Sequence, residues 1–193
     1  MIPDEDFYKD PQVPGPSKEE IRCLVMCQAR VRKEQVVLEV GCGTGGLTVE
    51  LSQRAAKIYA VDKNPQALEV TRRNLRKLHP TGDVELIMGD ALEVMEDLPA
   101  YDVLVVGGSG GDLELIIKKA YKQLKPDGKI IVTAILLETK LYALKTLKSL
   151  DMDPKIVEVS VARGKVTEQG TMMLGQNPVA IISGEKMLTK SHW

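Results

Sequence analysis

Short apolar runs alternate along the chain with segments whose apolar residues recur at helical spacing. The pattern predicts strands over residues 35–40, 57–62, 84–90, 101–108, 129–135, 155–163 and 177–185. It predicts helices over residues 18–31, 45–54, 64–78, 113–124 and 138–150. Strands that alternate with helices in this way form a parallel sheet with right-handed crossovers.

The last two predicted strands follow each other without a helix between them, which implies one antiparallel strand at an edge of the sheet. Most of the strands are almost continuously apolar, as is typical of a sheet covered by helices on both faces. We therefore expect an α/β fold built on a mixed, seven-stranded sheet.

The two ends of the chain differ from its middle. Four prolines within residues 1–17 forbid a continuous helix there, and we expect this segment to line the functional site. Ser17 and Glu20 have the spacing of a capping box, which predicts the start of the first helix. Residues 18–185 are predicted to form a single domain, and residues 186–193 a polar tail.

Composition and charge narrow the class of protein. Of the 193 residues, 44% are hydrophobic and 27% are charged, and the net charge is −1. This balance excludes a strongly basic nucleic-acid-binding surface overall. The first ten residues are acidic and polar, unlike a signal peptide, and no apolar run approaches the roughly 20 residues that span a bilayer. We expect neither nucleic acid nor membrane as a partner.

The three cysteines, Cys23, Cys27 and Cys42, argue against a disulfide framework, because their number is odd and their spacing irregular. This favours a reducing compartment, and we expect a cytoplasmic protein. Cys23 and Cys27 lie four residues apart on one helix face. We expect two buried apolar side chains there, because no further Cys or His lies nearby in sequence, and we predict no metal site.

The stretch "VVLEVGCGTGG" (36–46) leads from a predicted strand directly into four glycines. A strand that ends at Gly41 and turns into a helix near Gly45 brings backbone N–H groups to the carboxyl edge of the sheet, where open α/β sheets bind ligands. Asp62 ends the second strand, 21 residues after Gly41, where a carboxylate can accept both hydroxyls of a ribose. The pattern indicates a nucleoside-like ligand.

The glycine loop by itself leaves two alternatives open. One is a turn that serves packing alone, which does not require matching residues at the ends of other strands. The other is a dinucleotide site, whose fingerprint is G-x-G-x-x-G. The series "EVGCGTG" resembles motif I of the class I S-adenosylmethionine methyltransferases, and "GDA" (89–91) and "LKPDGKIIV" (124–132) resemble later motifs of that family. The resemblance implies a Rossmann-like fold with S-adenosyl-L-methionine as cofactor. The cofactor contacts that it implies are Gly41, Cys42, Gly43, Thr44, Gly45, Asp62, Lys63, Asp90 and Ala91.

The loop after the fourth strand separates substrate classes. Methylases of adenine or glutamine amino groups commonly carry [DN]-P-P-[YF] there, whereas this chain has "VVGGSGG" (105–111). Together with "PGPSKEEIRCLVM" (14–26), this loop resembles the decarboxylating carbon-15 methyltransferases of cobalamin biosynthesis, which act on a late precorrin or cobalt-precorrin. The resemblance covers nearly the whole chain and implies a homotetramer. It also implies a cofactor contact for Ser17, where the family more often has Thr.

A tetrapyrrole substrate of this kind is a large macrocycle with many carboxylates, so it needs an open floor and a few cations. The candidate cations are Arg22, Arg163 and Lys165, each with an ordinary surface charge as the alternative. The methyl donor is already activated, so alignment and exclusion of water are the main tasks, and we assign no catalytic residue. The expected floor consists of Gly107, Gly108, Ser109 and Gly110.

Two other functions stay open on the sequence alone. An RNA methylase of similar fold, acting on a ring nitrogen in tRNA, would need a basic surface and salt-sensitive binding. A non-catalytic protein that binds an adenosyl nucleoside would carry the same motifs.

Overall fold

The structure is a computed structural model that describes residues 1–187. Most of the predicted tail over residues 186–193 lies outside the described residues. Within them, no helix combines the length and the apolar character needed to cross a membrane.

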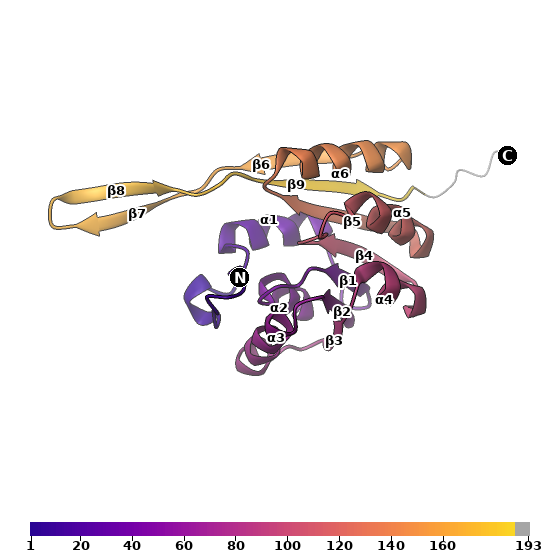
Figure 1. The fold of residues 1–193 in the computed structure, drawn as a ribbon, viewed down its shortest axis with the longest axis horizontal. Helices are drawn as coiled ribbons and strands as arrows, with labels where there is room; N and C mark the ends of the chain where they lie inside the picture. Colours follow the sequence, from indigo (N-terminus) through magenta and orange to yellow (C-terminus); the bar gives the residue numbers. More distant parts are fainter. Residues whose placement is uncertain (188–193) are drawn as a thin grey trace.

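Seven strands form the central sheet in the order β3-β2-β1-β4-β5-β9-β6, with helices on both sides (Figure 1). The strands are β1 Val36–Val40, β2 Lys57–Asp62, β3 Asp83–Met88, β4 Tyr101–Val106, β5 Leu124–Ala134, β6 Lys155–Val159 and β9 Val179–Glu185. The helices are α1 Glu19–Ala29, α2 Gly46–Ser52, α3 Pro65–Leu78, α4 Ala91–Asp97, α5 Leu113–Gln123 and α6 Leu137–Ser149, and a 3-10 turn, η1, spans Asp4–Asp6. The mixed, seven-stranded α/β sheet predicted from the sequence is confirmed.

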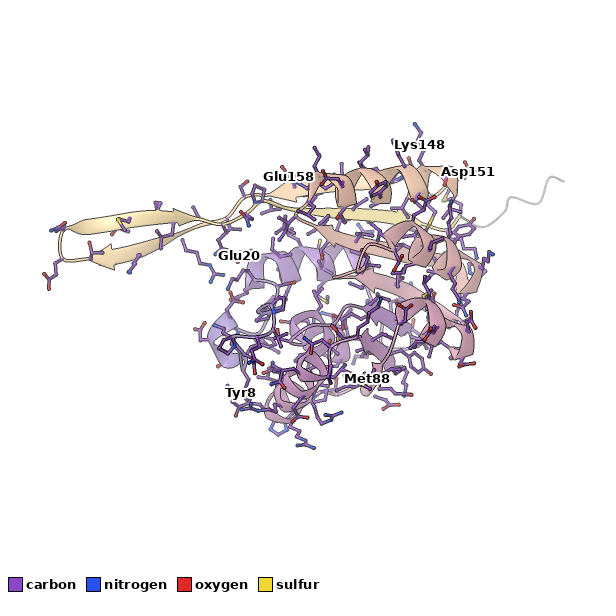
Figure 2. The ribbon with its side chains drawn as sticks, viewed as in Figure 1. Tyr8, Glu20, Met88, Lys148, Asp151 and Glu158 are labelled. Carbon is purple, nitrogen blue, oxygen red and sulfur yellow. The ribbon has the colours of Figure 1, made fainter. Side chains whose placement is uncertain are left out.

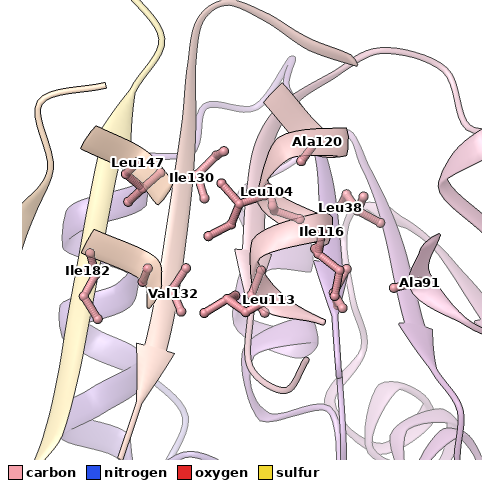
Figure 3. Close-up of a cluster of buried hydrophobic side chains, with 14 of the residues drawn as sticks. Leu38, Ala91, Leu104, Leu113, Ile116, Ala120, Ile130, Val132, Leu147 and Ile182 are labelled. Atoms are coloured by element: carbon pink, nitrogen blue, oxygen red, sulfur yellow. The ribbon is translucent and has the colours of Figure 1, made fainter. Parts of the chain in front are cut away.

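Alternate residues of the central strands point to opposite faces of the sheet. Leu38 and Leu104 belong to a buried cluster with residues of α4, α5 and α6 (Figure 3). Val37 and Val103 belong to a second cluster with residues of α1, α2 and α3. Because both faces are covered, ligand access is left to the ends of the strands.

The antiparallel strand is β9, and it lies between β5 and β6. The sequence pattern predicts one antiparallel strand, but places it at the edge. Burial explains the difference, because β9 is largely buried whereas four of the five residues of β6 are exposed. The more apolar strand takes the inner position, and the amphipathic one forms the edge.

The end of β3 and the start of α1 differ from the sequence-based expectation. Strand β3 ends at Met88 instead of residue 90, and α4, which the apolar pattern does not predict, follows directly. The carboxylate of Asp90 caps α4 by accepting a hydrogen bond from the N–H of Leu92 at 2.8 Å. The Ser17–Glu20 capping box is not formed, because α1 has Lys18 at its N-cap and no side chain caps it.

A second, two-stranded sheet extends away from the body as a long hairpin (Figure 1). It consists of β7 Ala162–Thr167 and β8 Gly170–Gly175, and every residue of both strands is exposed. The sequence pattern predicts a strand through residue 163 but not this hairpin. Its residues face no core, so they carry no alternation of buried and exposed positions from which strands could be recognised.

Candidate functional site

The loops after β1, β2 and β4 meet at one edge of the sheet. In the parallel register, Val40 lies opposite Val61 on one side and opposite Val106 on the other. The glycine loop that follows Val40 therefore starts between the loops of the two neighbouring strands.

The glycines of this loop are required by backbone conformation and by close approach. Gly41, Gly43 and Gly45 have positive φ angles of 73°, 56° and 81°. A Cβ at Gly41 would lie 2.5 Å from the backbone nitrogen and oxygen of Gly108. The loops after β1 and β4 thus touch through their main chains, which only a residue without a side chain permits.

Asp62 fixes the geometry of two loops at once. One carboxylate oxygen accepts a hydrogen bond from the N–H of Gly43 at 2.8 Å, and the other accepts one from the N–H of Asn64 at 2.9 Å. A carboxylate oxygen has two lone pairs, so each keeps an acceptor position for a ligand. Asn64 in turn caps α3 by accepting a hydrogen bond from the N–H of Gln66 at 2.9 Å.

Asp90 and Lys63 form an ion pair on the next loop. The Lys63 ammonium lies 2.6 Å from an Asp90 carboxylate oxygen. This hydrogen bond, aided by the N–H of Leu92, lowers the pKa of Asp90. The same contact raises the pKa of Lys63. Asp90 is therefore held as a carboxylate.

These loops enclose a first cavity of about 330 Å³, which we call the motif cavity. Val13 and Pro14 of the N-terminal segment also border it. The sequence-predicted cofactor residues that line it are Gly41, Gly43, Asp62, Lys63, Asp90 and Ala91. Cys42 and Thr44 have buried side chains, so they can offer only their backbone, and Gly45 serves as the N-cap of α2.

A second cavity of about 710 Å³, which we call the wide cavity, opens next to the first. It extends from residues 14–18 across the ends of β4 and β5 to the start of α6 and the base of the hairpin. Ser17 lines this cavity and not the motif cavity. The predicted floor residues lie between the two cavities and line both, namely Gly107, Gly108, Ser109 and Gly110.

Arg22 does not provide a cation to either cavity, contrary to the sequence-based expectation. Its side chain is fully buried, and its guanidinium pairs with the Asp4 carboxylate at 2.7 Å. The guanidinium also donates hydrogen bonds to the backbone carbonyls of Ile2 and Ser17. Its Nε lies 3.7 Å from a carboxylate oxygen of Glu50. A guanidinium on the inner face of α1 needs such partners, because an unpaired buried charge is strongly unfavourable. Arg22 ties the N-terminal segment to the domain.

Arg163 is likewise engaged with carboxylates. It stands on β7 and donates to both carboxylate oxygens of Glu20, at 2.9 and 2.7 Å, and it lies 3.0 Å from Asp4. Figure 2 shows Glu20 at the start of α1, beside the base of the hairpin. Arg163 lines neither cavity, so it links the hairpin to the N-terminal segment in this structure.

The cysteines are arranged differently from the expectation. Cys23 and Cys27 are exposed on α1, whereas Cys42 is buried, and burial raises the pKa of the Cys42 thiol well above its usual range. Helix α1 buries Ile21, Val25 and Met26 instead, and the two cysteines fall on its outer face. Within residues 1–187 there is no group of three or more His, Cys, Asp and Glu side chains that could hold a metal ion.

Two features of the site escape sequence reasoning. Tyr142 and the residues around the start of α6 line the wide cavity, although no motif marks them. Glu39, the acidic residue just before the glycine loop, is fully buried and accepts a hydrogen bond from the Thr48 hydroxyl at 2.6 Å. Burial raises the pKa of Glu39 to about 8, and the charge of Asp62 adds to the shift.

Comparison with known proteins agrees with this arrangement. The precorrin methyltransferase domain family matches residues 5–186. A probable cobalt-precorrin-6B C(15)-methyltransferase (decarboxylating) from Methanothermobacter thermautotrophicus is 51% identical over 183 residues, which are 94% of this chain and 95% of that protein.

Solved structures are similar over the same length. The crystal structure of precorrin 8W decarboxylase from Methanobacterium thermoautotrophicum superposes with a TM-score of 0.92 at 49% identity, covering 95% of this chain and 99% of that one. A precorrin-6y C5,15-methyltransferase from Geobacter metallireducens superposes with a TM-score of 0.88 at 31% identity, covering 96% and 98%. The chain therefore belongs to the precorrin methyltransferase family, and it is an S-adenosylmethionine-dependent methyltransferase.

Proposed function

We propose that this enzyme methylates carbon 15 of a late cobalt-precorrin and removes the acetate carboxyl group of the same substrate as CO2, in cobalamin biosynthesis. The observation that carries the proposal is the pair of cavities that share the Gly107–Gly110 loop. One cavity has the polar groups that a nucleoside needs, and the other has the size and apolar walls that a macrocycle needs. The similarity to decarboxylating methyltransferases supports the same assignment.

The motif cavity fits an adenosyl cofactor. When bound there, S-adenosylmethionine supplies a methyl group activated by a positively charged sulfur. Asp62 would accept hydrogen bonds from the ribose hydroxyls through its remaining lone pairs, and Asp90 would accept from the adenine amino group. Gly41 and Gly43 would allow the main chain to approach the ligand, because they present no Cβ.

The wide cavity would hold the tetrapyrrole with its reacting carbon toward the shared loop. Its walls are mostly apolar, and Ser109, Thr133 and Thr139 add hydroxyl groups. The contribution of the chain is to align the ring carbon with the methyl group and to exclude water, since proximity alone can remove a large part of the barrier. Decarboxylation leaves an electron pair that the conjugated macrocycle can accept.

The state of the protein in the cell is part of the same proposal. The hairpin β7–β8 exposes Val166, Met172, Met173 and Leu174, and Val166 is 80% exposed. An apolar arm of this kind is unfavourable in water and suits contact with further copies of the chain, so we propose a homotetramer.

The absence of disulfides among the three cysteines supports a reducing, cytoplasmic location.

The assembly proposal is tested by sedimentation of the wild type and of the double variant Val166→Ser, Met173→Ser. The wild type should sediment as a tetramer, and the variant as a smaller species that still binds S-adenosylhomocysteine. If the variant sediments as the same species as the wild type, the hairpin has no role in assembly. A monomeric wild type would contradict the tetramer itself.

The activity is tested first by calorimetric titration with S-adenosylhomocysteine and, separately, with NADH. Asp62→Asn should weaken binding of the adenosyl compound about tenfold to a hundredfold, because hydrogen bonds to a charged group contribute roughly 1.5–3 kcal/mol. Asp97→Asn, which removes a carboxylate away from both cavities, is the matched control and should bind like the wild type. Tight NADH binding would overturn the cofactor assignment.

Turnover then separates the remaining functions. Incubation with S-adenosylmethionine and cobalt-precorrin-6B should give a product that has gained one methyl group and lost one CO2, detected by mass spectrometry. Methylation of tRNA without a tetrapyrrole product would establish the RNA methylase instead. Cofactor binding with no turnover of either substrate would favour a non-catalytic binding protein.

A further inference from the structure

The wide cavity carries very little charge for a site that would receive a polyanion. Among the described residues that line it, only Lys18 is a cation and only Glu138 is an anion at neutral pH. The rest of the lining is apolar or carries uncharged hydroxyl, amide and backbone groups. A substrate with many carboxylates therefore meets one positive side chain in this cavity.

Two arginines that could also bind a substrate carboxylate are already paired with carboxylates of the protein. Arg22 is buried against Asp4 and Glu50, and Arg163 is paired with Glu20 and Asp4. Lys18 is half-buried and makes no ion pair or side-chain hydrogen bond within residues 1–187. Its ammonium is the cationic group of this cavity that is left to pair with a ligand.

The position of Lys18 is not explained by the stability of its helix. Lys18 is the N-cap of α1, where the helix dipole disfavours a positive charge and where Ser, Thr, Asp or Asn is preferred. The main chain at this point is nevertheless firmly held. Arg22 donates to the carbonyl of Ser17 from its side chain and to the carbonyl of Lys18 from its backbone N–H, at 2.9 Å in the second case. A buried ion cluster thus fixes a locally unfavourable cation at the wall of the cavity.

We propose that Lys18 is the residue that binds and orients the substrate, by pairing with one carboxylate side chain of the tetrapyrrole. This inference rests on the proposed function and specifies which group selects the orientation of the macrocycle. Glu138 lies at the start of α6, on the face of the sheet opposite to α1, and also lines the wide cavity. Its charge repels the carboxylates of the substrate and so disfavours a macrocycle bound in the reversed orientation.

The carboxylate that pairs with Lys18 is one that the product retains. An ammonium group beside the departing carboxylate would stabilise the ground state, because the negative charge leaves that group as CO2 forms. Such a contact would slow the loss of CO2. Lys18 therefore contributes to substrate binding and orientation, and the departing acetate lies elsewhere in the cavity.

Kinetics of Lys18→Gln with cobalt-precorrin-6B tests the proposal. We expect KM to rise about tenfold to a hundredfold, as the loss of a charge-assisted hydrogen bond implies, with kcat changed by less than about threefold. Lys18→Arg should restore most of the affinity. Binding of S-adenosylhomocysteine should not change in either variant, since Lys18 does not line the motif cavity.

Two control variants exclude general effects of charge. Lys122→Gln removes an exposed lysine of α5 outside the wide cavity, and it should leave KM unchanged. Glu138→Gln should leave KM unchanged or lower it. An unaltered KM in Lys18→Gln, or an equal rise in Lys122→Gln, would overturn the assignment. A faster loss of CO2 in Lys18→Gln would show that Lys18 faces the departing carboxylate, and would overturn it too.

A binding measurement separates this inference from the proposed activity. The protein is titrated with uroporphyrin, a tetrapyrrole with acetate and propionate side chains, and binding is followed by fluorescence. The same titration with the octamethyl ester of uroporphyrin, which carries no carboxylates, is the comparison. If the wild type does not turn over the precorrin but binds uroporphyrin in a Lys18-dependent manner, the activity is wrong and the site is right. If the precorrin is turned over and the KM does not depend on Lys18, the proposed activity is right and the assignment of Lys18 is wrong. A wild type that neither turns over the precorrin nor binds uroporphyrin overturns both.

Discussion

The motif cavity and the wide cavity are built in different ways, although they share one loop. The motif cavity is formed mainly by short loops that directly follow β1, β2, β3 and β4, so each of its polar groups is a few residues from a strand end. The wide cavity combines the N-terminal segment, the ends of β4 and β5, the start of α6 and the base of the hairpin. A cofactor site of the first kind is specified locally, whereas a substrate site of the second kind exists only in the folded chain.

The same contrast appears in how charge is used. In the motif cavity, Asp62 and Asp90 are held by backbone N–H groups, and the Lys63 ammonium balances Asp90. In the wide cavity, the charges that matter structurally lie behind the wall, in the cluster of Asp4, Arg22 and Glu50. The first cavity is stabilised by its own lining, and the second by an ion cluster that never reaches it.

Removal of the Arg22 charge should therefore affect the two cavities unequally, and it is the largest effect we expect. Arg22→Met would leave the buried carboxylates of Asp4 and Glu50 without their common partner, although Asp4 would keep Arg163 and Glu50 would keep Arg54. Breaking a buried ion pair from one side costs roughly 3–5 kcal/mol. Urea unfolding should show a loss of this order, and limited proteolysis should cleave within residues 1–17.

The matched control is Arg163→Gln, which removes the exposed partner of Asp4 and should cost less than about 1 kcal/mol. In Arg22→Met, binding of S-adenosylhomocysteine should weaken far less than binding of the tetrapyrrole, since only Val13 and Pro14 of the N-terminal segment border the motif cavity. Equal losses for both ligands would contradict this difference and would mean that the two cavities depend on the ion cluster alike.

How much of the molecule is predictable from sequence follows the same division. The strands of the central sheet, Asn64 as a cap, Asp62 at the end of β2 and Asp90 just after β3 can be recognised because each depends on neighbouring residues. The roles of Arg22 and Arg163 cannot, because their partners Asp4, Glu20 and Glu50 become neighbours only through folding. An arginine that binds a substrate and one that binds a buried aspartate look the same in a sequence.

Even local patterns fail where tertiary contacts compete with them. The Ser17–Glu20 pair has the spacing of a capping box, but Glu20 binds Arg163 and the Ser17 carbonyl binds Arg22. Helix α4 was absent from the apolar pattern because it is short and buries only Ala91 and Met95. Asp90 and Glu93 do carry the spacing of a helix start, so a capping signal was present where the apolar signal was weak.

Glu39 offers a smaller and pH-dependent test of the motif cavity. Its carboxyl lies just beneath the glycine loop, fully buried, with a pKa of about 8 in the folded protein because burial disfavours the charged form. In the unfolded chain this group titrates near the usual 4.5. The stability that it contributes is therefore complete below about pH 4.5 and is lost progressively as the pH rises toward 8.

Glu39→Gln removes this titration while keeping an acceptor for the Thr48 hydroxyl. Relative to the wild type, the variant should gain stability between pH 5.5 and 8.5, by about 3 kcal/mol, measured from unfolding midpoints across that range. A stability difference that does not vary with pH would contradict a neutral, buried Glu39. The charge of Asp62 contributes to the raised pKa, so Asp62→Asn should lower the pKa of Glu39 in the folded protein. The loss of stability would then still begin near pH 4.5 but end at a lower pH than in the wild type. That coupling would show that the charge of Asp62 acts on the buried carboxyl of Glu39 beneath the glycine loop, as expected for a cavity that is specified by its own lining.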